Sequence, residues 1–200
     1  MIRYAITSGD SLRSPAALLA DARRWADEGV EYVQLREKWM EAGELVGLAV
    51  EMVGIFREHG GRTKLLVNGR ADVAVAAGAD GVHLTAGHDE LTPEQVRRVF
   101  AANGREAVVS VSCHTVEEVG RAREADLILF GPVFEKRVEG EVVVEGMGLG
   151  SLREACEVGG GVPVLALGGV GGENIGTCLD AGAGGVAGIR LFEVKSDILT

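Results

Sequence analysis

The sequence predicts an α/β fold: a single (β/α)8 TIM barrel with a closed parallel sheet and a shortened eighth helix. First, eight short apolar runs alternate with helical patterns along the 200 residues, which favours parallel βαβ units. Second, "AGADGVHL" (77–84) and "AGAGGVAG" (181–188) share a helix end, a glycine turn and a strand, half a barrel apart. Any αβ loop can converge on that pattern, and a doubly wound open sheet is the alternative fold.

The expected strands are 4–7, 32–36, 64–68, 81–84, 107–113, 127–131, 163–168 and 185–190, and the expected helices are 15–28, 41–58, 70–77, 93–102, 115–123, 148–157 and 172–181. Ser14 before Pro15, Thr92 before Pro93, and Thr115 are helix start signals. After the last strand the chain has only "LFEVKSDILT", which is short for an eighth helix. No linker interrupts the chain, so residues 1–200 are expected to form one domain.

Composition excludes several classes of protein. The formal net charge of −10 supplies no basic stripe for nucleic acid, whereas local cations and backbone N–H groups leave phosphate ligands open. The three cysteines, Cys113, Cys156 and Cys178, lack metal-binding spacing and are expected to be reduced thiols. No signal peptide and no run long enough to cross a membrane is found, which predicts a cytoplasmic protein.

The active site of such a barrel lies at the carboxyl ends of the strands. In "QLREK", the residues Gln34, Arg36 and Lys38 alternate with neighbours on the other face. We interpret Gln34 and Lys38 as a grip for a phosphate or diphosphate. Arg36 is a further candidate for substrate binding, but a structural network with Glu31 or Glu37 is the favoured interpretation.

Other strand ends add candidates. Asn68-Gly69 has the sequence of a hairpin turn, yet a helical pattern follows it, so Asn68 and Arg70 are expected at the barrel mouth. The remaining substrate-binding candidates are Ser112 in "SVSCHT", Lys136 in "FGPVFEKR", Gly168 and Gly169 in "LGGVGGEN", and Ile189 and Arg190 at the last strand. The two glycines, followed by a helix start, would present N–H groups to a phosphate.

Acids, bases and metal ligands are less clearly marked. His83 and His114 lie near strand ends and could exchange protons, although a buried, hydrogen-bonded histidine is the commoner alternative. Asp89 and Glu90 could hold Mg²⁺ together with a phosphorylated substrate. The alternative is that they cap the helix that begins at Pro93.

Taken together, "QLREK", "VNGRADVAVAAGADGVHL", "SVSCHT", "FGPVFEK" and "VPVLALGGVGGEN" resemble the thiamine phosphate synthase family and the related thiazole tautomerases, from Tyr4 to about Phe192. The synthase resemblance implies a transferase of thiamine biosynthesis. It joins hydroxymethylpyrimidine diphosphate to thiazole phosphate and releases diphosphate with the help of Mg²⁺. Gln34, Lys38, Asn68 and Ser112 would hold the pyrimidine diphosphate, and residues 168–169 and 189–190 the thiazole phosphate.

Three positions depart from the synthase pattern. Gly69 stands where the pattern has a magnesium-binding Asp, which leaves Asp89 as a lone metal ligand. "EKRVEG" replaces a Thr-x-Thr-Lys phosphate grip, and Ile189-Arg190 replaces Val-Ser. Lys136, Arg137 and Arg190 could offset the lost phosphate contacts, because cations grip phosphate at least as well as a hydroxyl.

Two alternatives stay open beside the synthase interpretation, which we prefer. A thiazole tautomerase would aromatise a carboxythiazole phosphate without a cofactor. It fits Asn-Gly-Arg, "VFE" and Glu145 to Gly148, but its catalytic histidine falls on Pro132, so Glu135, His114 or His83 would have to act instead. A non-catalytic paralogue that binds thiazole or thiamine phosphate is the other alternative. The barrel surface left uncovered by the short eighth helix points to a homodimer.

Overall fold

The computed structural model describes residues 1–9, 13–87, 89–138 and 141–193. Eight parallel strands close into a barrel in the order β1-β10-β9-β6-β5-β4-β3-β2. These strands are β1 (Ile2–Ile6), β2 (Tyr32–Leu35), β3 (Lys64–Asn68), β4 (Gly81–Thr85), β5 (Val108–Cys113), β6 (Leu127–Phe130), β9 (Val164–Leu167) and β10 (Gly185–Gly188). The predicted closed parallel barrel is therefore confirmed.

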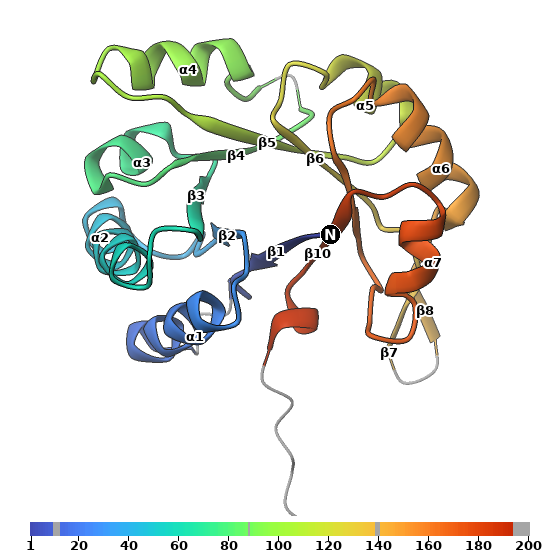
Figure 1. The fold of residues 1–200 in the computed structure, drawn as a ribbon, viewed down its shortest axis with the longest axis horizontal. Coiled ribbons are helices and arrows are strands. Elements are labelled where there is room, and N and C mark those ends of the chain that lie inside the picture. Colours follow the sequence, from blue (N-terminus) through green and yellow to red (C-terminus); the bar gives the residue numbers. More distant parts are fainter. Residues whose placement is uncertain (10–12, 88, 139–140, 194–200) are drawn as a thin grey trace, which may run out of the picture.

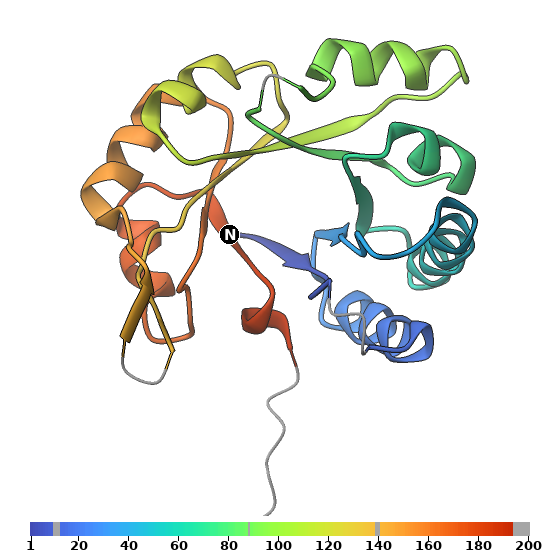
Figure 2. The same cartoon turned by 180° about the vertical axis from the view of Figure 1, so that it is seen from behind.

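The helices of the described residues form a ring outside the strands (Figures 1 and 2). They are α1 (Pro15–Asp27), α2 (Ala42–Glu58), α3 (Ala71–Ala77), α4 (Pro93–Ala101), α5 (Val116–Arg121), α6 (Gly148–Val158) and α7 (Ile175–Asp180). The predicted N-caps are confirmed, because the hydroxyls of Ser14, Thr92 and Thr115 each accept a backbone N–H of the first turn. Such a cap contributes about 1 kcal/mol.

The eighth helix is reduced to the 3-10 turn η1 (Arg190–Phe192), drawn in red between α7 and α1 in Figure 1. Two side chains of α1 hold it in place: the Trp25 indole N–H donates to the Phe192 carbonyl over 3.0 Å, and the Arg24 guanidinium donates to the same oxygen. The predicted shortening is confirmed, and the short turn is fixed to the first helix.

The barrel strands bury two different faces. Outward residues such as Ala5, Val33 and Ile128 pack against the helices in the main core. The alternate residues, which point inward, differ between the two halves of the barrel. An apolar cluster fills one half from β1, β6, β9 and β10: Tyr4, Ile6, Leu127, Leu129, Leu165 and Ala187. Inward positions on β2 to β5 carry Gln34, Asn68, His83, Ser110 and Ser112, so one half of the interior is polar.

An antiparallel hairpin, β7 (Lys136–Val138) and β8 (Glu141–Val144), is inserted between β6 and α6 and was not predicted. Charged residues and glycine in "EKRVEGEVVVEG" are typical of a loop, which concealed the two short strands. Its base is fastened to the segment after β6, since Met147 N–H donates to the Pro132 carbonyl and Gly148 N–H to the Val133 carbonyl, each over 2.9 Å. Figures 1 and 2 show the hairpin at the periphery, away from the ring of strands.

Two predicted boundaries were wrong at the carboxyl end of the chain. Strand β10 ends at Gly188 and not at Arg190, because the chain turns into η1. Helix α7 begins at Ile175 and not at 172, because Gly171 and Asn174 form a turn in which the Asn174 side chain accepts the Gly171 N–H over 2.9 Å. Among the described residues, no helix is long and apolar enough to cross a membrane.

Candidate active site

The polar half of the barrel interior opens at the carboxyl ends of the strands. There the Gln34 side-chain amide donates to the Asn68 side-chain oxygen over 2.8 Å. Gln34 is 2% exposed, and within the described chain its amide oxygen accepts no hydrogen bond. A buried acceptor without a donor costs free energy, so this oxygen is ready to accept a donor from a ligand.

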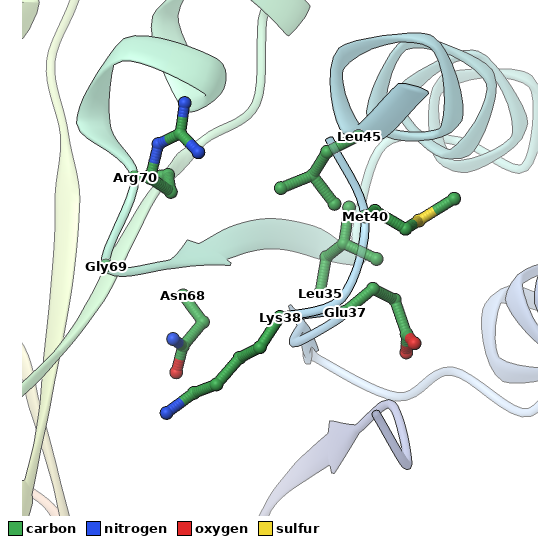
Figure 3. A pocket seen from close by; sticks show the side chains of 8 residues that line it. All are labelled: Leu35, Glu37, Lys38, Met40, Leu45, Asn68, Gly69 and Arg70. Carbon is green, nitrogen blue, oxygen red and sulfur yellow. The ribbon is translucent and has the colours of Figure 1, made fainter. Parts of the chain in front are cut away.

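A cavity of about 260 Å³ lies between the ends of β2 and β3 and is lined by Leu35, Glu37, Lys38, Met40, Leu45, Asn68, Gly69 and Arg70. Figure 3 shows the side chains of Lys38 and Asn68 pointing to the same side of this cavity. Arg70 points away from them, toward α3. Lys38 is exposed and points to the same side of the cavity as Asn68, whose side chain is hydrogen-bonded to Gln34. An anion grip at these residues stays a prediction.

Arg70 lies at the predicted place but is already engaged. Its guanidinium donates to both carboxylate oxygens of Asp72, over 2.9 and 2.7 Å. This pair holds the pKa of the Asp72 carboxyl down at about 2 and raises the pKa of Arg70. A guanidinium neutralised in this way has less charge to offer a substrate anion.

The partners expected for Arg36 are occupied elsewhere. Glu31 accepts from the backbone N–H of Arg3 and forms an ion pair with its guanidinium. Glu37 is buried and accepts from the Gly9 N–H and, over 2.8 Å, from the Trp39 indole N–H. The Arg36 guanidinium instead repels a proton on His83 inside the barrel and so contributes to lowering the pKa of that histidine. Glu37 is a cavity residue that sequence reasoning did not place in the site.

A chain of hydrogen bonds crosses the barrel interior from β1 to β5. The Tyr4 hydroxyl lies 2.9 Å from the Ser110 hydroxyl, which lies 2.8 Å from Nδ1 of His83, and Nε2 of His83 lies 3.2 Å from the Ser112 hydroxyl. Burial, together with the Arg36 guanidinium, lowers the pKa of His83 to about 3. His83 is therefore neutral near pH 7, which bears out the buried, hydrogen-bonded alternative.

His114, which follows β5, lies beside the segment that follows β6 and carries the candidates Glu135 and Lys136. The exposed His114 donates from Nδ1 to the Gly131 carbonyl over 2.6 Å, and its backbone N–H donates to Glu118. This places its ring beside the segment that leads to Glu135, whose side chain is also exposed. Lys136 begins β7, but its side chain lies outside the described part of the structure.

Gly168 and Gly169 are required by packing. An added Cβ would lie 2.6 Å from the Pro132 Cα at Gly168, and 2.6 Å from the Phe134 Cβ at Gly169. The two segments are also joined by backbone hydrogen bonds. Since α7 begins only at Ile175, these glycines do not stand at its N-terminus, contrary to the expected cradle. Ile189 packs against the inner apolar cluster, whereas Arg190 is exposed.

The carboxylates after β4 line a second cavity of about 400 Å³, with Gly69, Leu84, Asp89, Glu90, Leu91 and Gln95 around it. The Glu90 carboxylate accepts a hydrogen bond from the Thr85 backbone N–H over 2.9 Å, which links the two ends of the loop after β4. The side chain of Asp89 is exposed. Gly69 borders both cavities. Within the described ranges, no three His, Cys, Asp or Glu side chains are grouped to hold a metal ion.

Comparison with known proteins identifies the family of the chain. The family model for thiamine monophosphate synthase matches residues 3–192. This chain belongs to the thiamine monophosphate synthase family. The thiamine-phosphate synthase of Methanospirillum hungatei is 37% identical to it over 201 residues, covering 98% of this chain and 91% of the relative. That of Thermus thermophilus is 38% identical over 165 residues, covering 81% of this chain and 74% of the relative.

A solved structure of the same family supports the fold. The thiamine phosphate pyrophosphorylase from Pyrococcus furiosus matches with a TM-score of 0.77 and 25% identity, covering 97% of this chain and 88% of that protein. The family resemblance predicted from the motifs is thereby confirmed. Sequence reasoning had missed Tyr4 and Ser110, because a residue in the middle of a barrel strand carries no local signal of a partner on the opposite strand.

Proposed function

We propose that this member of the thiamine monophosphate synthase family is a transferase that joins hydroxymethylpyrimidine diphosphate to thiazole phosphate and releases diphosphate. The observation that carries the proposal is the convergence of Lys38, Asn68 and the buried amide of Gln34 at one side of the barrel mouth. A cation beside amide groups suits a ligand that carries both an anionic diphosphate and a polar aromatic ring.

The proposed reaction needs charge stabilisation more than acid–base chemistry. The bond from the pyrimidine methylene carbon to the diphosphate oxygen breaks, and its electron pair leaves with the diphosphate. The thiazole ring nitrogen then donates its lone pair to that carbon. Lys38 would stabilise the departing negative charge, and a preorganised cation of this kind acts most strongly where charge develops. The orphan oxygen of Gln34 would accept a donor from the pyrimidine ring.

The donors present fit a magnesium ion that is shared with the substrate. Mg²⁺ is commonly held by one or two carboxylates together with substrate phosphates and waters, and Asp89 is an exposed carboxylate in the cavity next to Gly69. We assign Asp89 as its protein ligand. When bound, the ion would neutralise diphosphate charge, which makes diphosphate a better leaving group.

The test is the formation of thiamine phosphate by the full chain from the two substrates, with and without Mg²⁺. Calorimetry with inorganic diphosphate in the same two conditions measures the anion grip separately. The proposal expects product and Mg²⁺-dependent diphosphate binding. Metal-independent aromatisation of carboxythiazole phosphate would establish the tautomerase instead. Tight binding of a phosphate ester with neither reaction would establish a binding protein.

A further inference from the structure

Four residues inside the barrel form a continuous line of hydrogen bonds that the proposed reaction does not yet use. Tyr4, Ser110 and His83 are 0, 0 and 4% exposed, so water does not compete for their polar atoms. Ser112 is half-buried and lies near the carboxyl end of β5, on the side of the mouth. The line Tyr4–Ser110–His83–Ser112 therefore runs from the closed interior to the open end; we call it the relay.

The direction of each hydrogen bond follows from the donors and acceptors available. Among the residues that the structure describes, two side-chain atoms lie within hydrogen-bonding distance of the buried Tyr4 hydroxyl: the Ser110 hydroxyl at 2.9 Å and His83 Nδ1 at 3.4 Å. Burial raises the pKa of Tyr4, so this hydroxyl keeps its proton and must donate it. Ser110 at the shorter distance accepts it, and the proton of Ser110 then goes to Nδ1 over 2.8 Å.

The opposite arrangement leaves a buried proton without an acceptor. If Nδ1 carried the proton of the neutral imidazole, both Tyr4 and His83 would donate to Ser110. The Ser110 proton would then have no acceptor among the relay atoms, and an unmade hydrogen bond in a buried position is unfavourable. The favoured state has a bare Nδ1 and a proton on Nε2. That N–H donates to the Ser112 hydroxyl over 3.2 Å.

We propose that His83 is a positioning residue that commits the Ser112 hydroxyl to donate its proton toward the bound substrate. Ser112 accepts from His83 and so has its own O–H left to donate at the mouth. Such a donor suits an atom that carries a lone pair and no proton, either a diphosphate oxygen or a pyrimidine ring nitrogen. The inference rests on the proposed function and deepens it, because it assigns a donor to that substrate.

The tautomer is measured on the full chain labelled with ¹⁵N-histidine. His83 is assigned by the resonances that disappear in His83→Gln, which separates it from the three other histidines. We expect a neutral ring with its proton on Nε2 and no titration between about pH 5 and pH 8. A proton on Nδ1, or an imidazolium within that range, would overturn the proposal. This measurement needs no enzymatic activity.

The coupling is measured by calorimetry in a double-mutant cycle of Ser110→Ala and Ser112→Ala. The probes are inorganic diphosphate and hydroxymethylpyrimidine without phosphate, which separate the two kinds of acceptor. Ser110→Ala frees His83 to change tautomer, so it should weaken one probe by about 3- to 10-fold when Ser112 is present. It should have no further effect when Ser112 is already alanine.

The remaining outcomes are equally decisive. If Ser110→Ala lowers stability but changes neither probe, or changes a probe equally in both backgrounds, the relay is structural and the proposal is overturned. The expected tautomer and coupling in a chain that makes no thiamine phosphate would refute the proposed function and leave the relay standing. Formation of thiamine phosphate without the coupling would support the proposed function and refute the role of the relay.

Discussion

Gly69 lies between the two cavities of the candidate site, where the proposed magnesium ion would be held. It borders both the cavity with Lys38 and the cavity with Asp89. Its φ of 64° lies in the left-handed region, and a Cβ added there would meet nothing within 4 Å. Space for a side chain therefore exists where the synthase pattern has an aspartate, and the backbone conformation is one that Asp and Asn tolerate better than other side chains.

Gly69→Asp should strengthen magnesium-dependent binding of diphosphate. A carboxylate at the border of the two cavities would add a ligand to that of Asp89. A charge-assisted contact of about 1.5–3 kcal/mol corresponds to tenfold or more in the Mg²⁺ concentration required. Calorimetry with inorganic diphosphate over a magnesium series measures it. Gly69→Asn is the matched control, since it has the same shape without the charge. Equal effects of both variants would contradict the expected charge effect.

Lys38→Ala should weaken binding of inorganic diphosphate by about 10- to 100-fold, because it removes a contact between an ammonium group and an anion. Lys64→Ala is the control. Lys64 is also exposed but starts β3, at the opposite end of the strand from Asn68. Calorimetry of both variants at one salt concentration distinguishes a local grip from the general loss of a positive charge. Similar losses in the two variants would refute the grip.

At the level of elements, the segment after β6 and the loop after β9 are packed together and joined by backbone hydrogen bonds. Val133 N–H donates to the Leu167 carbonyl over 2.8 Å, and Phe134 N–H donates to the Gly168 carbonyl over 3.0 Å. The glycines at 168 and 169 allow this approach. The pattern "LGGVGG" thus indicated a special loop correctly, but the neighbour that requires glycine there is a different element, which a local pattern does not reveal.

Gly168→Ala should lower the free energy of unfolding by about 1–3 kcal/mol, since the new methyl group meets the Pro132 Cα and the φ of 87° disfavours a side chain. Urea unfolding followed by circular dichroism measures this loss. Gly150→Ala is the control. It lies within α6 with no atom within 4 Å of an added Cβ, so it should raise stability by about 0.5–1 kcal/mol. A neutral Gly168→Ala would contradict the packing argument.

At the scale of the whole molecule, the sequence predicts what is periodic and misses what depends on closure. Alternation of apolar residues and the caps at Ser14, Thr92 and Thr115 predicted eight strands and seven helices within a few residues. Because the same alternation located the strands, it also predicted Gln34, Lys38 and Asn68 at the carboxyl ends of β2 and β3. The contact of Tyr4 with Ser110 joins opposite strands, 106 residues apart in the chain, and exists only because the barrel closes. The β7–β8 hairpin was missed because its composition is that of a loop.

The neutral His83 inside the closed barrel makes the stability of the molecule depend on pH. Its pKa is about 3 in the folded state and about 6.5 in an unfolded chain. Between these values the unfolded state binds the proton and the folded state does not, so stability falls as the pH falls from 6.5 toward 3. At pH 5 the loss from this one group should reach about 2 kcal/mol relative to pH 7.5.

Urea unfolding of the wild type and of His83→Gln at pH 7.5 and pH 5 measures this contribution. His83→Gln should be less stable than the wild type at pH 7.5, because the relay is interrupted, but it should lose about 2 kcal/mol less on acidification. His59→Gln is the control. His59 lies at the end of α2 beside Asp27, with its side chain 31% exposed, so this variant removes a histidine without altering the relay. If His83→Gln showed the wild-type difference, His83 would take up its proton in the folded state as readily as in the unfolded chain. Nδ1 would then donate to Ser110 at pH 5, and the direction assigned to that hydrogen bond would be refuted.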